Sequence, residues 1–158
     1  MSVVGLVVIL DQVVKALVRP RLELHESITV ISGFFSLTRV HNTGAAFGLM
    51  NNIDFPLKAA VLALLQTVAL IGLTVYVAML APHQRLTRLG LSFVIGGAIG
   101  NLIDRVIYGY VLDFFDFYSG GWHFWASKVP TAPINTGVAL MILDMLGAGR
   151  LYRVSRTI

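Results

Sequence analysis

Three groups of polar residues stand within or beside the apolar stretches of this sequence, and they are the residues that could do chemistry. The first runs from Asp11 to Lys15, the second from Asn42 to Phe47 and the third from Gly96 to Phe114. Charged side chains are costly in an apolar setting and usually mark an ion pair, a water-filled cavity or a functional site. We therefore expect the functional site among these groups.

The first group, Asp11-Gln12-Val13-Val14-Lys15, contains an acid and a base four residues apart. Residues at this spacing lie on one face of a helix and can pair. A structural ion pair near the end of a membrane span is favoured here over a direct role in catalysis.

The second group reads Asn42-Thr43-Gly44-Ala45-Ala46-Phe47. An Asn or Thr followed by small residues suits a helix start with close backbone packing. Asn42 could also offer its amide to a substrate, but on the residues alone a cap or turn is the favoured interpretation.

The third group is the densest. Asn101, Asp104 and Arg105 are spaced i, i+3 and i+4, so we expect them on one helix face, where Asp104 and Arg105 neutralise each other or bond to neighbours. Gly96 and Gly100 are four residues apart and predict a close contact with another helix.

Asp113 follows this helix, beside Phe114. A carboxyl group in apolar surroundings has a raised pKa, and that is the state a general acid or base uses. Catalytic and structural roles for Asp113 both stay open at this point.

Several other chemistries find no support. The chain has no cysteine, no His-Glu-x-x-His motif, no Gly-x-Ser-x-Gly motif and no Gly-rich phosphate loop after a strand. Its histidines, His25, His41, His83 and His123, lack the spacing of metal ligands. Acids are therefore the main candidates for catalysis, and we expect no metal and no cofactor.

The composition indicates a membrane protein. Of the 158 residues, 56% are hydrophobic and 13% are charged, and the mean hydropathy is +0.79. Soluble domains carry about 25% charged residues, so both a soluble domain and a disordered chain are disfavoured. The net charge of +4 suits basic loops that set membrane orientation better than nucleic-acid binding.

Four apolar stretches predict four transmembrane helices in a single domain, 1–158, with spans at about 1–18, 57–80, 89–107 and 134–150. The first is weak, because few residues precede Asp11 and none of them is basic. We expect a longer N-terminus than the sequence shows, with a reentrant segment as the alternative.

The basic residues set the orientation. Arg85 and Arg88 lie between spans two and three, and Arg150, Arg153 and Arg156 lie in the tail, so both regions and both termini are expected in the cytoplasm. Segments 19–56 and 108–133 then lie on the outer side. In the first of these, Ile28–Ile31 and Phe34–Val40 predict a small hairpin.

Taken together, the motifs resemble those of the bacterial lipoprotein signal peptidases (signal peptidase II). Asp11 to Lys15 resembles the family's D-Q-x-x-K, and Asn42 to Phe47 resembles its N-x-G-A-A-F. Gly96 to Phe114 resembles G-G-A-x-G-N-x-x-D-R followed by V-x-D-F, and Ile134 to Asp144 resembles the last span. The resemblance covers nearly the whole chain, in order and at family spacing.

The resemblance implies an all-α membrane protein with four transmembrane helices and a small periplasmic β-cradle, in the bacterial inner membrane with cytoplasmic termini. It implies an aspartic peptidase that needs no metal and cuts diacylglyceryl-modified prolipoproteins before the lipidated cysteine. The partners implied are that substrate and membrane lipids.

Asp113 matches the first catalytic aspartate. Asn42, Asn101, Asp104 and Arg105 match positions that shape or support the substrate site, and Asp11 and Lys15 match structural positions.

The chain departs from the family at the second catalytic aspartate. The family reads W-H-F-P-A-F-N-x-A-D-S-A-I where this chain has the segment from Trp122 to Ile134. The aspartate position therefore holds Thr131, and the family's Asn is replaced by Lys128. Asp116 and Asp144 are unconvincing substitutes. Two prolines near this point are expected to delay the last helix to about Ile134.

A coding explanation fits these residues. The family's Ala-Asp-Ser-Ala encoded as GCC-GAC-AGC-GCC and read one base later gives Pro-Thr-Ala-Pro, which is the sequence of residues 130–133. We hypothesise two compensating frameshifts around 125–133. The alternative to an active peptidase is a catalytically impaired homologue that binds precursors without cleaving them.

Overall fold

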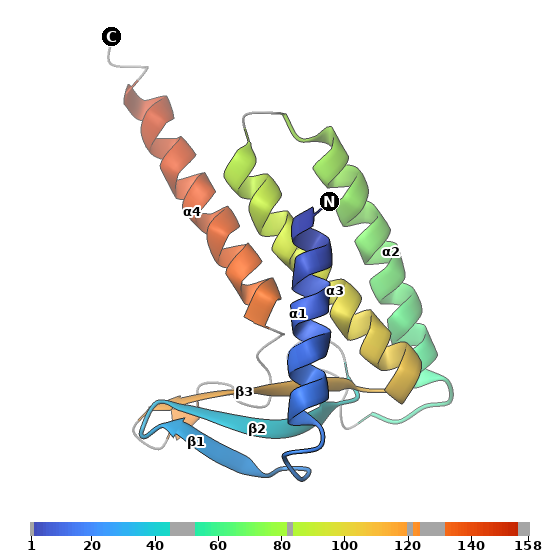
Figure 1. The fold of residues 1–158 in the computed structure, drawn as a ribbon. Coiled ribbons are helices and arrows are strands. Elements are labelled where there is room, and N and C mark those ends of the chain that lie inside the picture. Colours follow the sequence, from blue (N-terminus) through green and yellow to red (C-terminus); the bar gives the residue numbers. More distant parts are fainter. Residues whose placement is uncertain (1, 45–52, 82–83, 120–121, 124–131, 155–158) are drawn as a thin grey trace.

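The computed structural model of the chain describes residues 2–44, 53–81, 84–119, 122–123 and 132–154. Its helices stand side by side, and a small sheet lies across one end of them (Figure 1). The helices are α1 (Ser2–Val18), α2 (Lys58–Met79), α3 (Arg85–Tyr108) and α4 (Ala132–Val154). Each forms from one of the four apolar stretches, and α3 contacts all three of the others.

The sheet is antiparallel, with its strands in sequence order. The strands are β1 (Ser27–Ile31), β2 (Phe35–Asn42), β3 (Val111–Ser119) and β4 (Trp122–His123). The expected hairpin is confirmed as β1 and β2, and its turn contains Gly33 at φ +77°, a left-handed conformation that glycine adopts readily. The resemblance implied a cradle, but the residues themselves did not predict β3 or β4.

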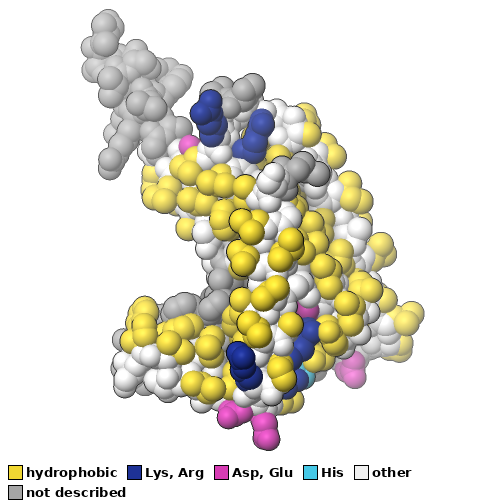
Figure 2. All heavy atoms as spheres, in the orientation of Figure 1, with side chains coloured by type: hydrophobic (Ala, Val, Ile, Leu, Met, Phe, Trp, Pro, Cys, Tyr) yellow, Lys and Arg dark blue, Asp and Glu magenta, His cyan; other side chains and the backbone are white. Residues whose placement is uncertain are grey.

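The outer surface of the helices is apolar. Leu64, Val68 and Ile71 of α2 are each 60% or more exposed, which suits a lipid environment and not water. Among the described helices, α2 and α3 are long and apolar enough to cross a membrane, and α4 contains a shorter apolar segment, Pro133–Leu146. Figure 2 shows apolar side chains covering the helices, with the charged side chains gathered towards the two ends.

Glycines let α3 approach its neighbours closely. A Cβ on Gly96 would lie 2.7 Å from the Val7 side chain of α1, and one on Gly100 would overlap Asp11. The predicted close contact through Gly96 and Gly100 is therefore confirmed. On another side of α3, a Cβ on Gly90 would lie 2.7 Å from the carbonyl oxygen of Gly137 in α4.

The last helix begins earlier than the prolines suggested. It starts at Ala132, two residues before the expected Ile134, with Pro133 in its first turn. The first helical positions tolerate proline, because their N–H groups have no partner within the helix. The first turn of α4 lies against α3, where a Cβ on Gly97 would lie 3.2 Å from Pro133 Cβ.

A small apolar core joins the helices to the sheet. Val18 at the end of α1 and the following Leu22 pack with Leu112 and Phe114 of β3. The start of β3 is thereby fixed against the end of α1. This contact places the residues between them, including Asp113, at the junction of the helices and the sheet.

Candidate active site

A buried ion network joins α1 to α3. Lys15 Nζ lies 2.7 Å from Asp11 Oδ2 and 2.8 Å from Asp104 Oδ2, and it donates to Asn101 Oδ1 at 3.1 Å. Lys15 and Asp104 are fully buried. The predicted pairing of Asp11 with Lys15 is confirmed, and Asp104 shares the same ammonium group.

Arg19 completes this network and Asp104 links it to the sheet. Arg19 Nη2 donates to Asp104 Oδ1 at 2.8 Å, and its guanidinium lies 3.5 Å from the centre of the Tyr108 ring. Asp104 Oδ2 also accepts the backbone N–H of Leu112 at 3.2 Å. The negative charges of Asp11 and Asp104 are thus balanced by the positive charges of Lys15 and Arg19. The bond from Leu112 to Asp104 fixes the backbone one residue before Asp113.

Asp113 lies on β3 beside the end of β2. Asn42 Nδ2 donates to Asp113 Oδ2 at 3.0 Å, and both side chains are buried. The neighbouring backbone pairs are Asn42 with Val111 and Val40 with Asp113. The sheet register therefore brings together two residues that are 71 positions apart in the sequence.

Burial raises the pKa of Asp113 to about 6. The hydrogen bond from Asn42 and the positive charges of Lys15 and Arg105 act in the opposite direction. A carboxyl group with this pKa exchanges its proton near neutral pH, which is the property expected of a general acid or base. The raised pKa expected from the sequence is therefore present at Asp113.

Arg105 points to a different set of partners from Asp104. Its Nη1 donates to Gln66 Oε1 of α2 at 2.5 Å, and its Nη2 donates to the carbonyl oxygen of Gly44 at 2.7 Å. Gln66 also donates to the carbonyl oxygen of Ala98 at 2.5 Å. The arginine therefore connects α2, α3 and the chain that follows β2.

Two expectations about these residues were wrong in part. Asn101 and Asp104 face α1, but Arg105 reaches α2, because consecutive helical residues point about 100° apart. Asn42 does not start a helix: it ends β2, and its Oδ1 accepts the Gly44 N–H at 3.0 Å. The turn interpretation of Asn42 is correct, and the same side chain also contacts Asp113.

Arg19 and Gln66 are two residues of the site that the sequence motifs do not mark. Arg19 lies one helical turn after Lys15, and this spacing was a usable signal that it continues the same face. Gln66 is the one amide in the long apolar stretch 57–80. A polar group in such a setting usually has a partner on a neighbouring helix, so a bond between helices could have been expected, though not which helix it would reach.

Thr131 and Lys128 lie outside the residues that the structure describes. Asp144 lies on α4 and accepts hydrogen bonds from the N–H and hydroxyl of Thr87, in the first turn of α3. That turn is at the end of α3 away from the sheet (Figure 1), so Asp144 does not accompany Asp113. Within the described ranges, no three His, Asp or Glu side chains are grouped as metal ligands.

The chain resembles solved membrane enzymes in fold. Two structures described as bacterial membrane enzymes match with a TM-score of 0.72 and 27% identity, one covering 92% of this chain and 85% of its own, the other 91% and 90%. The fold is therefore one that bacterial membrane enzymes adopt.

The family model for signal peptidase (SPase) II matches residues 3–147. The lipoprotein signal peptidase of Maridesulfovibrio salexigens is 43% identical over 143 residues, which are 90% of each chain. That of Geobacter metallireducens is 42% identical over 138 residues, 87% of this chain and 84% of its own. This chain belongs to the signal peptidase II family.

Proposed function

We propose that this protein is an endopeptidase that removes signal peptides from diacylglyceryl-modified bacterial prolipoproteins, cutting before the lipidated cysteine. Membership of the family supports the substrate class. The observation that carries the chemistry is Asp113, a buried carboxyl with a pKa of about 6 beside the amide of Asn42.

The proposed reaction is an acid–base hydrolysis by two carboxyl groups that share one proton. The ionised carboxylate takes a proton from water as the water oxygen adds to the scissile carbonyl carbon. The protonated carboxyl then supplies a proton to the amide nitrogen as the C–N bond breaks. We take Asp113 as one of the two groups. By the resemblance, the other belongs at position 131, where this chain has threonine.

The remaining polar residues have proposed roles around this centre. Asn42 orients Asp113, and Arg105 binds a carbonyl or ester oxygen of the substrate. Asn101 and Asp104 support the site through the ion network, in which Asp11 and Lys15 are structural. Because the network is buried and neutral in charge, it holds the helices at the site without competing for the substrate.

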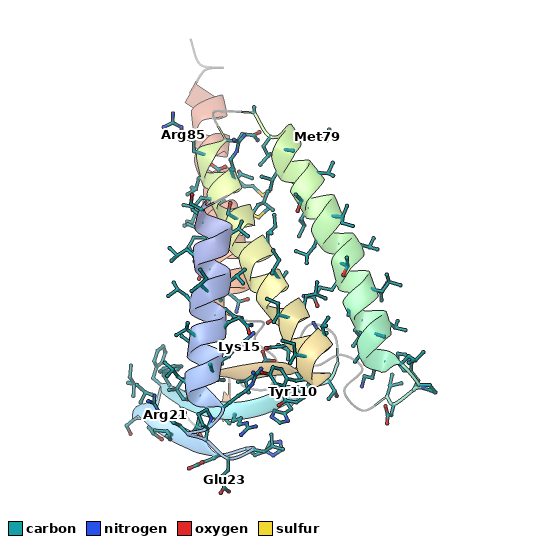
Figure 3. The ribbon with its side chains drawn as sticks, turned by 45° about the vertical axis from the view of Figure 1, so that its right-hand side comes forward. Lys15, Arg21, Glu23, Met79, Arg85 and Tyr110 are labelled. Atoms are coloured by element: carbon teal, nitrogen blue, oxygen red, sulfur yellow. The ribbon has the colours of Figure 1, made fainter. Side chains whose placement is uncertain are left out.

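We further propose that all four helices cross the inner membrane, with both termini in the cytoplasm and the sheet on the outer face. The distribution of charge supports this orientation. Arg85 lies at one end of the helices, whereas Arg21, Glu23 and the sheet lie at the other (Figure 3). The site at the sheet would then meet precursors at the outer membrane surface, where their lipid stays in the bilayer.

A second candidate function rests on Thr131. A hydroxyl cannot share a proton as a carboxylate does, so a chain with threonine in place of the second carboxyl group would bind precursors and cleave them slowly or not at all. Reading the coding DNA of residues 125–133 in the shifted frame tests the frameshift hypothesis. The hypothesis fails if no Asn-x-Ala-Asp-like peptide is encoded there.

The function is tested by incubating the purified chain with a diacylglyceryl prolipoprotein and looking for the product that starts at the cysteine. Cleavage that Asp113→Asn abolishes supports the peptidase. Binding without cleavage, with cleavage restored by Thr131→Asp and Lys128→Asn together, supports the impaired homologue. Failure of both the chain as written and the restored variant to bind and to cleave overturns the proposal.

A further inference from the structure

Gln66 is a polar side chain in the middle of an apolar helix. The two threonines of α2, Thr67 and Thr74, donate to carbonyl oxygens four residues earlier in the same helix, Ala63 and Leu70, at 2.8 Å. Gln66 instead forms its bonds with α3. The Gln66 amide therefore connects α2 with α3 and is not used in hydrogen bonds within α2.

Both ends of the Gln66 amide are used. The NH2 group donates to the carbonyl oxygen of Ala98, and the oxygen accepts from Arg105 Nη1, each at 2.5 Å. Ala98 fixes the orientation of the amide, so its oxygen is presented to Arg105. A guanidinium group held in this way loses less rotamer freedom when it binds a ligand.

The second contact of Arg105 sets its direction. Its Nη2 donates to the Gly44 carbonyl oxygen at 2.7 Å, and Gly44 is tied to Asn42 by the 3.0 Å bond from its N–H. Asn42 in turn donates to Asp113. A continuous chain of hydrogen bonds thus runs from Gln66 through Arg105, Gly44 and Asn42 to Asp113.

We propose that Gln66 is a positioning residue for substrate binding: it holds the Arg105 guanidinium at the site and acts through Arg105 alone. The guanidinium carries five N–H donors in a fixed planar arrangement, and the two contacts with Gln66 and Gly44 hold two of them. This proposal rests on the proposed function, in which Arg105 binds a carbonyl or ester oxygen of the lipidated precursor.

The test is a double-mutant cycle on binding. The probe is a synthetic diacylglyceryl-cysteine peptide that spans a signal-peptide junction, and every variant carries Asp113→Asn so that no cleavage occurs. Gln66→Met keeps the length of the side chain but loses both hydrogen bonds. Thr67→Val is the matched control, because it removes a hydroxyl of the adjacent residue that bonds only within α2.

Gln66→Met is expected to weaken binding about tenfold, since a hydrogen bond to a charged group is lost, while Thr67→Val binds as the parent does. In an Arg105→Gln background, Gln66→Met is expected to have no further effect. Gln66→Glu keeps an oxygen acceptor for Arg105, so its binding is expected to stay within about threefold of the parent. This variant also supplies the test if Gln66→Met does not fold.

Several results would overturn the inference. One is an affinity of Gln66→Met for the peptide equal to that of the parent. Another is a loss of affinity on Gln66→Met that is the same with Arg105 and with Arg105→Gln, which would assign Gln66 to helix packing. A third is a loss of peptide affinity in Gln66→Glu as large as the loss in Gln66→Met. If the parent itself does not bind the peptide, the proposed function fails and the inference fails with it, so the two failures are distinguishable.

Discussion

The side chain of Asn42 forms two hydrogen bonds: its Nδ2 donates to Asp113 Oδ2 at 3.0 Å, and its Oδ1 accepts the N–H of Gly44, also at 3.0 Å. One neutral side chain thereby connects the end of β2 with the carboxyl group on β3 and with the backbone that Arg105 contacts. A neutral donor stabilises the ionised carboxylate less than a full positive charge does. Burial consequently dominates, and the pKa of Asp113 stays raised.

Asp113→Asn is expected to stabilise the fold above pH 6 while it abolishes cleavage. The folded-state pKa is raised from 3.8 to about 6, so the carboxyl group costs stability as pH rises through this range. At 1.36 kcal/mol per pKa unit, the cost above pH 6 is of the order of 3 kcal/mol. Unfolding in detergent at pH 8 should show a gain for the Asn variant, and the gain should vanish near pH 4.

Equal stability of the parent and of Asp113→Asn at pH 8 would contradict this account of Asp113. Asn42→Ala supplies a second measurement, because it removes the donor that favours the ionised form. It should raise the pKa of Asp113 further, and a fall in this pKa would contradict the assignment of Asn42.

Lys15→Met is expected to destabilise the protein strongly. Asp11 and Asp104 would be left buried without their shared ammonium group, and breaking a buried pair costs about 3–5 kcal/mol. Arg21→Met is the control, because Arg21 is exposed. Equilibrium unfolding of both variants in the same detergent checks the difference, and similar stabilities would argue against a structural network.

Gly100→Ala is expected to push α1 away from α3. Its Cβ would overlap the carboxylate of Asp11, whereas a Cβ on Gly72 meets nothing within 4 Å. Overpacking of a close contact costs about 1–3 kcal/mol. Thermal unfolding should therefore show a loss for Gly100→Ala and none for Gly72→Ala. A Gly100→Ala variant as stable as the parent would mean that the helices do not meet as closely as the structure places them.

The sequence predicted the elements whose signals are local. Apolar stretches predicted the helices, β-branched residues predicted the hairpin of β1 and β2, and the i, i+4 spacing predicted the pairing of Asp11 with Lys15. Gly96 and Gly100 predicted a close helix contact by the same kind of argument. In each case the pattern lies within one segment of the chain.

The parts that it did not predict depend on contacts between distant segments. β3 begins shortly after α3 ends, and its pairing with β2 brings Asn42 to Asp113. Arg105 turns to α2 because Gln66 offers an acceptor there, 39 positions away. No local spacing encodes such a pairing.

Efficient cleavage is proposed to need Asp113 together with a carboxyl group at position 131, which Thr131 does not supply. This requirement is tested most directly by comparing cleavage of a diacylglyceryl prolipoprotein by the chain as written and by the variant with Thr131→Asp and Lys128→Asn. General acid–base catalysis contributes about 10²–10⁴-fold, so the variant should release the cysteine-started product at least about 100 times faster, and Asp113→Asn should abolish this activity. Equal rates for the two chains, or cleavage that persists in Asp113→Asn, would contradict the account.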